Sequence, residues 1–125
     1  MSYYILYDKK NYLVKLKIFG IDKENKDKAN ISENEILMFC KEKNCSNLLI
    51  DLRYLNKKYE NFYNYFKFGK NIAKKFIGIK IAYLLPVNLR SKEINKSNYE
   101  FENDMNDLFK EFTSIENAID WFHKF

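Results

Sequence analysis

The sequence predicts a single α/β domain built around a central β-sheet, and three segments support this prediction. The run from Leu48 to Leu52 is apolar on both faces of an extended segment except at Asp51, as is typical of a strand sandwiched between helices in a parallel or mixed sheet. The segment from Tyr12 to Phe19 alternates between apolar residues and lysines, which is the period-two pattern of a half-buried strand. The segment from Tyr59 to Phe76 carries apolar residues at helical spacing.

The composition fits one domain of ordinary size. Of the 125 residues 46% are apolar, which is enough for a core, and the chain holds only three Gly and one Pro. So few glycines and prolines argue against long disordered stretches and against a glycine-rich phosphate loop. The abundance of Phe, Tyr, Lys, Asn and Ile is what codon bias in an AT-rich genome produces, so single Lys or Tyr residues carry little functional weight.

The N-terminal residues and the longest apolar stretch indicate where the protein is located. Residues 1–11 show no basic lead followed by an apolar stretch, so we expect no signal peptide. The longest apolar stretch, from Ile77 to Val87, is interrupted by Lys80 and is shorter than the roughly 20 residues that span a bilayer. We therefore expect a cytoplasmic protein without a transmembrane segment. Cys40 and Cys45 fit reduced thiols in that compartment, with a disulfide as the alternative.

The N-terminal residues predict an antiparallel hairpin. Tyr3 to Tyr7 forms one strand, Asp8 to Asn11 a polar turn, and Tyr12 to Phe19 a second strand that ends at Gly20. One face of the second strand carries Val14, Leu16 and Ile18. The opposite face carries Lys15 and Lys17, with Leu13 and Phe19 at its ends.

The middle of the chain predicts a helix, a strand and a second helix. Ile21 to Lys43 is mostly helical, and its best start is Ser32, because Ser32 and Glu35 have the spacing of a capping box. A turn and the central strand Leu48 to Leu52 follow. The first helix turns inward Ile36, Leu37 and Cys40. The second helix has an apolar face made of Tyr59, Phe62, Tyr63, Phe66, Gly69, Ala73 and Phe76.

The C-terminal part predicts a strand, a helix, a short strand and a helix. Ile79 to Leu85 is a buried strand that ends at Pro86, and Ser97 to Glu100 repeats the capping-box pattern. The helix that follows carries Phe101, Met105 and Leu108, and Phe112 lies on the short strand. Thr113 or Ser114 caps the last helix, which buries Ile115, Ala118, Ile119 and Phe122. The predicted order is β-β-α-β-α-β-α-β-α in one domain over residues 1–125.

Four segments, in this order, resemble the STAS-like family, in the branch similar to sporulation anti-sigma-factor antagonists. They are the hairpin strand ending in Gly20-Ile21-Asp22, KEKNCSNLLIDLR from Lys41 to Arg53, KIAYLLP from Lys80 to Pro86, and FTSIENAIDWF from Phe112 to Phe122. The resemblance implies a mixed sheet of four or five strands with an N-terminal hairpin and about four helices. This architecture overlaps with that of the lipid-carrying Sec14-like fold.

The sequence departs from that family where a regulatory switch is expected. Regulatory antagonists of this type carry a phosphorylatable Ser or Thr just after the central strand, whereas this chain has no Ser or Thr between Ser46 and Ser91. Tyr54 and Tyr59 carry hydroxyls there, but a serine kinase does not recognise tyrosine. The resemblance therefore implies a module without a serine phospho-switch.

Asp51, at the end of the central strand, has two interpretations. A phospho-accepting aspartate needs further acids to hold a divalent cation, and Asp22 is the only other acid at a predicted strand end. The structural interpretation is that Asp51 caps a turn or pairs with Arg53.

Cys40, Cys45 and His123 are too few and too scattered for a zinc site, which needs about four ligands. We expect no metal, no cofactor and no enzymatic activity.

The charge is unevenly distributed along the chain. Arg53 to Lys96 holds 11 Lys and Arg against two acids, a net charge of +9, and Ser97 to Phe125 holds seven acids against two lysines, a net charge of −5. Lys67, Lys70 and Lys74 share a helical stripe that indicates either a patch for phosphate or anionic lipid or a solvated flank. No nucleic-acid motif accompanies it, which disfavours a nucleic-acid partner. The opposite charges of the two segments also suit the pairing of two copies.

Tyr65 and Phe68 widen the apolar surface of the second helix. Such widening indicates a thick aromatic core, a self-association surface or an apolar ligand pocket. We expect a non-enzymatic binding module that associates with a protein partner or with itself as a homodimer. The alternative is a carrier of a small apolar or lipid ligand, by analogy with the Sec14-like fold. The candidate partner or ligand surface consists of Asp51, Arg53, Tyr54, Tyr65, Lys67, Phe68, Lys70 and Lys74.

Overall fold

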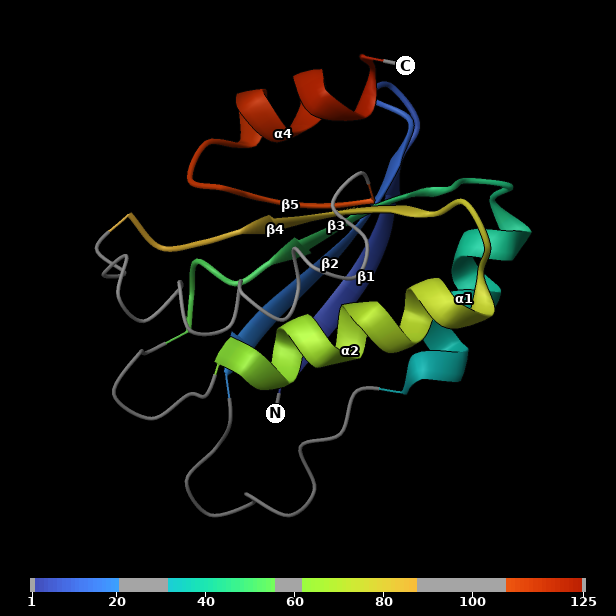
Figure 1. Ribbon diagram of the computed structural model, residues 1–125, viewed down its shortest axis with the longest axis horizontal. Coiled ribbons are helices and arrows are strands. Elements are labelled where there is room, and N and C mark those ends of the chain that lie inside the picture. The colour runs from blue at the N-terminus through green and yellow to red at the C-terminus, as the bar shows by residue number, and fades with distance from the viewer. Residues whose placement is uncertain (1, 21–31, 56–61, 88–107, 125) are drawn as a thin grey trace.

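The protein forms a five-stranded mixed sheet with helices on both faces (Figure 1). The computed structural model describes residues 2–20, 32–55, 62–87 and 108–124. The strands lie in chain order: β1 (Ser2–Asp8), β2 (Leu13–Gly20), β3 (Asn47–Asp51), β4 (Lys80–Leu84) and β5 (Phe109–Phe112). β1 runs antiparallel to β2, and every later neighbouring pair is parallel. The predicted α/β class with an N-terminal hairpin is confirmed.

Helices cover the two faces unequally. Within the described ranges the helices are α1 (Glu33–Glu42), α2 (Phe62–Lys75) and α4 (Ile115–Phe122). Figure 1 shows α1 and α2 on one face of the sheet and α4 on the other. Leu48 and Ile50 of β3 pack beneath α1 and α2, while Leu49 packs beneath α4. The central strand is apolar on both faces because each face is covered by a helix, as predicted.

The predicted order of elements holds wherever the structure describes the chain. The helix predicted to begin at Ser97 lies outside the described residues except at its end, Leu108, which is in a turn. The first half of the predicted helix from Ile21 to Lys43 also lies outside them. The described residues hold three helices, so the expected number of about four is not confirmed.

Two predicted helix starts are confirmed by their caps. The Ser32 hydroxyl accepts a hydrogen bond from the Glu35 backbone N–H at 3.2 Å, and the Ser114 hydroxyl accepts one from the Asn117 N–H at 3.4 Å. Each satisfies an amide that has no partner within the first turn of its helix. The Glu35 carboxylate also accepts a hydrogen bond from the Tyr3 hydroxyl at 2.8 Å, which joins the start of α1 to β1.

The predicted buried face of α2 is partly wrong. Tyr63 is exposed, whereas Tyr65 and Ile72 are buried together with Phe62 and Phe66. An apolar stripe through residues 62, 66, 69 and 73 can be widened on either side, since apolar residues flank it on both. The way α2 lies on the sheet decides the side, and it selects Tyr65 and Ile72. Tyr59 lies outside the described residues.

The predicted face of α4 is correct but incomplete. Ala118 and Phe122 are buried, and Ile115 and Ile119 are half-buried against the same cluster. Trp121 was not predicted to be buried, yet it is, with ring contacts to Phe112 and Phe122. A wide indole next to the predicted stripe extends the cover of α4 over β4 and β5.

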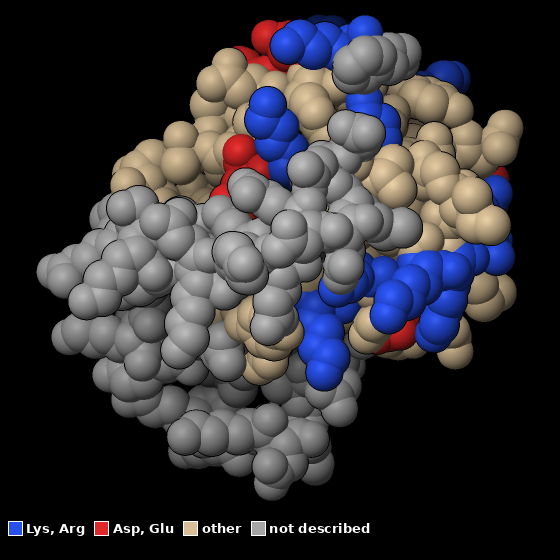
Figure 2. Space-filling view, viewed as in Figure 1, with Lys and Arg blue, Asp and Glu red and all other residues tan. Residues whose placement is uncertain are grey.

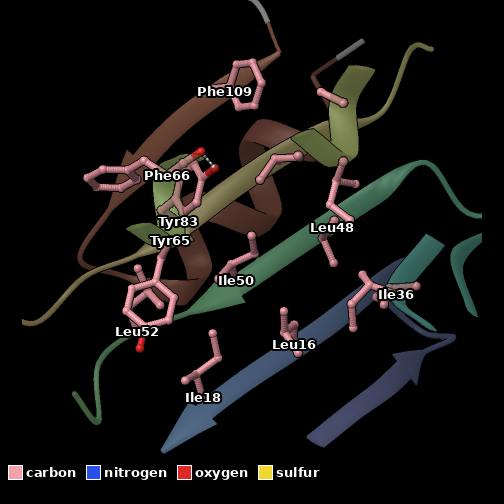
Figure 3. Packing of buried hydrophobic residues seen from close by; sticks show 14 of the residues in the cluster. Leu16, Ile18, Ile36, Leu48, Ile50, Leu52, Tyr65, Phe66, Tyr83 and Phe109 are labelled. Atoms are coloured by element: carbon pink, nitrogen blue, oxygen red, sulfur yellow. Dashed lines mark hydrogen bonds between the residues drawn. The ribbon is translucent and has the colours of Figure 1, made fainter. Parts of the chain in front are cut away.

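Aromatic side chains fill the space between α2 and the sheet (Figure 3). Tyr83 of β4 is fully buried, and its hydroxyl donates a hydrogen bond to the Phe66 carbonyl oxygen at 3.2 Å. The Phe66 and Tyr83 rings meet edge to face with their centroids 4.8 Å apart, which is a favoured geometry for aromatic pairs. Beside them the helix presents Gly69, which lets Tyr83 approach the α2 backbone.

Candidate functional site

The ends of the parallel strands form the edge at which the sequence predicts function. In parallel sheets ligands bind beyond the carboxyl ends of the strands. Asp51, the last residue of β3, is aligned with Lys17 of β2 and with Leu84 of β4. Aligned residues of neighbouring strands point to the same face, and Leu84 packs beneath α4. Asp51 and Lys17 therefore lie on the α4 face of the sheet.

The Asp51 carboxylate is buried and fully engaged by Arg53. Asp51 has 0% exposure, and the Arg53 guanidinium donates to it through Nε at 3.0 Å and through one terminal nitrogen at 2.9 Å. The Arg53 backbone N–H donates to the same carboxylate at 3.1 Å. Hydrogen bonding to Asp51 raises the pKa of the Arg53 guanidinium, as expected for a bidentate ion pair. Of the two interpretations of Asp51, this arrangement is the structural one, and Asp22 lies outside the described residues.

Beside this ion pair three exposed aromatic rings surround one lysine. The aromatic–lysine cluster consists of Tyr4 of β1, Lys17 and Phe19 of β2, and Tyr54, which follows β3. The ring centroids of Tyr4 and Phe19 are 5.6 Å apart, and those of Phe19 and Tyr54 are 5.5 Å apart. The three side chains are 42%, 44% and 50% exposed in that order. α4 leaves this part of the sheet uncovered, because it packs against β4 and β5.

The Lys17 ammonium lies among these rings. Its Nζ atom is 4.7 Å from the Tyr54 ring centroid, 5.8 Å from that of Tyr4 and 5.9 Å from that of Phe19. These distances are typical of cation–π contacts. Hydrogen bonding to Tyr54 raises the pKa of Lys17 above the usual value for a lysine. The Arg53 guanidinium carbon lies 5.7 Å from the Tyr54 ring and adds a second cation to the cluster's border.

An acidic side chain from α4 borders the same edge. The pKa of Glu116 is lowered by its own backbone N–H, by the Ser114 hydroxyl, which donates to the carboxylate at 2.9 Å, and by the charge of Arg53. Arg53 thus has one buried anion at Asp51 and one exposed anion at Glu116 within its electrostatic reach. The cationic surface that remains for a partner is centred on Lys17.

Only some residues of this site are predicted from the sequence. Arg53 and Tyr54 were predicted and lie at the edge, but Lys17, Phe19 and Tyr4 were assigned only to the hairpin. One signal points to them: Phe19 is a large aromatic residue on the lysine face of β2. The pairing of Tyr4 with Lys17 across β1 and β2 depends on the register, which the sequence does not state.

The remaining predicted surface residues lie elsewhere. Tyr65 is buried and Phe68 is half-buried against the main core cluster, so both belong to a thick aromatic core rather than to an exposed surface. Lys67 and Lys74 are exposed and Lys70 is half-exposed on α2. Figure 2 shows lysine and arginine side chains gathered over the region of α2. The structure therefore separates these lysines, on the helix beneath the sheet, from the edge at Asp51.

The other chemistry-bearing residues are used by the fold. Among the described residues no three His, Cys, Asp or Glu side chains gather as metal ligands would. Cys40 and Cys45 are free and buried, and burial raises the pKa of Cys40 to about 12. The His123 ring nitrogen Nε2 lies 2.7 Å from the Asn11 carbonyl oxygen.

In the described part of the chain no helix is both long enough and apolar enough to cross a bilayer.

Comparisons with protein-family models, with curated proteins and with solved structures found no match to this chain. The STAS-like resemblance therefore stays a prediction. Function is inferred from the residues at the Asp51 edge.

Proposed function

We propose that this chain is a non-enzymatic, STAS-like binding module that associates with a protein partner in bacterial regulation, without a serine phospho-switch. The mixed sheet with its N-terminal hairpin is compatible with this family. The absence of Ser and Thr between Ser46 and Ser91 removes the usual phosphate acceptor. Asp51, the residue best placed for phosphotransfer, has its carboxylate held by Arg53.

The aromatic–lysine cluster carries the proposal. Tyr, Phe and Arg are enriched in the buried centres of protein interfaces, and a few such residues supply most of the binding energy. The rings of Tyr4, Phe19 and Tyr54 already contact one another, so little side-chain entropy is lost when a partner covers them. Lys17 supplies a positive charge inside this apolar surface. The partner that fits is a protein segment with a carboxylate next to an apolar group.

The carrier alternative has no comparable observation in its favour. A carrier needs an apolar cavity, and the natural place for one is between α2 and the sheet. Tyr83 and Phe66 occupy that place and are bound to each other. Protein association is therefore the function that the described residues support best.

Site-specific photo-crosslinking in the source cells tests the proposal. A photoreactive phenylalanine analogue replaces Tyr54 in one variant and Met38 in the other, because Met38 is 64% exposed on α1 and lies outside the cluster. We expect one discrete crosslinked partner from position 54 and none from position 38. The partner is then identified and purified for binding measurements.

The binding measurements use substitutions at the cluster. Hot-spot residues contribute about 2 kcal/mol or more to the binding free energy. Lys17→Glu and Tyr54→Ser should therefore each raise the dissociation constant by about 30-fold. Met38→Ser should leave it unchanged. Equal crosslinking from both positions, or equal affinity in all three variants, would contradict the proposal.

A further inference from the structure

The two outermost strands of the sheet differ in how well they are protected against pairing with a strand of another chain. β1 and β5 are the outermost strands, at opposite edges (Figure 1). β5 has only four residues, and two of them are the charged Lys110 and Glu111. Short length and charge are the usual devices that stop an edge strand from pairing with another chain. β1 has seven residues, and neither a lysine nor a proline is among them.

The central part of β1 is also free of charge. Residues 3–7, with the sequence YYILY, form an apolar and aromatic run in a chain with 22 Lys and Arg and 17 Asp and Glu. The only charged residue of β1 is Asp8, at its end, and its carboxylate accepts hydrogen bonds from the Asn11 side chain at 2.8 Å and from the Asn11 backbone N–H at 3.1 Å. Each strand of a sheet offers backbone donors and acceptors to a neighbour on either side, and β2 takes one side of β1.

We propose that β1 pairs with β1 of a second copy of this chain, in antiparallel orientation about Ile5. This register places Ile5 opposite Ile5 of the other copy, Tyr3 opposite Tyr7 and Tyr4 opposite Leu6. It places Asp8 opposite Ser2, so no like charges oppose each other. A two-fold axis perpendicular to the sheet relates the copies and keeps each side chain on its own face.

The pairing extends both faces of the sheet. Tyr3, Ile5 and Tyr7 are half-buried against the core beneath α1 and α2, and the second copy covers their outer sides. On the opposite face, Tyr4 belongs to the aromatic–lysine cluster. The two clusters of the dimer then face the same side of one continuous sheet of ten strands.

Sedimentation velocity across a range of protein concentrations tests the self-pairing. A strand pair buries less surface than a permanent interface, so the mass should rise with concentration from that of one chain towards that of two. Leu6→Lys places a charge on the half-exposed Leu6 without removing a member of either core cluster. It should keep the protein monomeric. Ile77→Lys makes the same change at a 93% exposed site away from β1 and should leave the dimer intact.

Oxidative crosslinking tests the register and does not depend on the fold tolerating Leu6→Lys. Tyr4→Cys and Leu6→Cys, carried by chains of different size, should form a mixed disulfide when the two are combined, since directly opposite Cβ atoms lie about 4.5–5.5 Å apart. Each variant alone should crosslink far less.

Three outcomes overturn the proposal: a wild-type chain that stays monomeric at the highest concentration, an equal effect of both lysine variants on the mass, or a lack of mixed disulfide. Leu6 lies outside the aromatic–lysine cluster, so failure here leaves the test of partner binding at Tyr54 intact.

Discussion

The Tyr83 hydroxyl oxygen is so close to Gly69 of α2 that it would overlap with the Cβ atom of any other residue at that position. The hydroxyl is held there by its hydrogen bond to the Phe66 carbonyl oxygen. Glycine in the middle of a helix is unfavourable by about 1 kcal/mol relative to alanine. Here the missing side chain of Gly69 allows α2 to approach β4 closely enough for the Phe66 and Tyr83 rings to pack.

Gly69→Ala should destabilise the protein by about 1–3 kcal/mol, because overlap with Tyr83 outweighs the gain in helix propensity. Urea denaturation measures the loss, and Asn64→Ala, at an exposed site on the same helix, should be neutral or slightly stabilising. Tyr83→Phe removes the overlapping hydroxyl, so the loss should be smaller in that background by about 0.5 kcal/mol or more. Strictly additive effects of Gly69→Ala and Tyr83→Phe would show that the two residues do not compete for this space.

Arg53→Met should destabilise the protein by about 1–3 kcal/mol, because it leaves a buried carboxylate at Asp51 without its main donors. Lys75→Met is the matched control. It breaks the ion pair of Lys75 with Glu33 at 3.1 Å, in which both side chains are partly exposed, and should change stability by less than about 1 kcal/mol. Thermal or urea unfolding of the two variants compares them directly. Equal effects would mean that Asp51 gains no more from its arginine than an exposed carboxylate does.

Lys80→Met should loosen α4 from the sheet. The Lys80 ammonium donates to the carbonyl oxygens of Trp121 at 3.0 Å and Phe122 at 3.3 Å, and it lies 4.6 Å from the Trp121 ring centroid. A cation at the carboxyl end of a helix donates to the last carbonyl oxygens and interacts favourably with the negative end of the helix dipole. We expect a loss of about 1–2 kcal/mol and faster amide hydrogen exchange in α4. Lys124→Met, an exposed lysine just past the same helix end, should show neither effect.

Alkaline pH should destabilise the protein through Cys40. Burial raises the pKa of this thiol from 9.0 to about 12. Above pH 9 the unfolded chain releases the proton while the folded chain keeps it, so stability falls as the pH rises from 9 towards 12. One such thiol contributes a slope of about 1.36 kcal/mol per pH unit. Unfolding free energies measured across this range should show a shallower slope in Cys40→Ala than in the wild type, and an unchanged slope would disprove the assignment.

The sequence was sufficient for the elements whose patterns are local. The alternation in β2, the doubly apolar β3 and the Ser32 cap depend on spacing along the chain, and each was predicted. The cap of α4 was predicted as Thr113 or Ser114, and it is Ser114. The burial of Tyr65 in place of Tyr63 was not, because both are tyrosines beside the same stripe. Only the angle at which α2 lies on the sheet distinguishes them.

The candidate site divides in the same way. The sequence by itself determined that Asp51 ends a buried strand, that Arg53 and Tyr54 follow it, and that no Ser or Thr lies nearby. Only the tertiary structure decided that Lys17 stands opposite Asp51 and that Tyr4, Phe19 and Tyr54 meet around it. The physical reason is that strand register and helix placement set side-chain neighbours across the sheet. They follow from the packing of the whole core, whereas strand and helix patterns depend on residues a few positions apart.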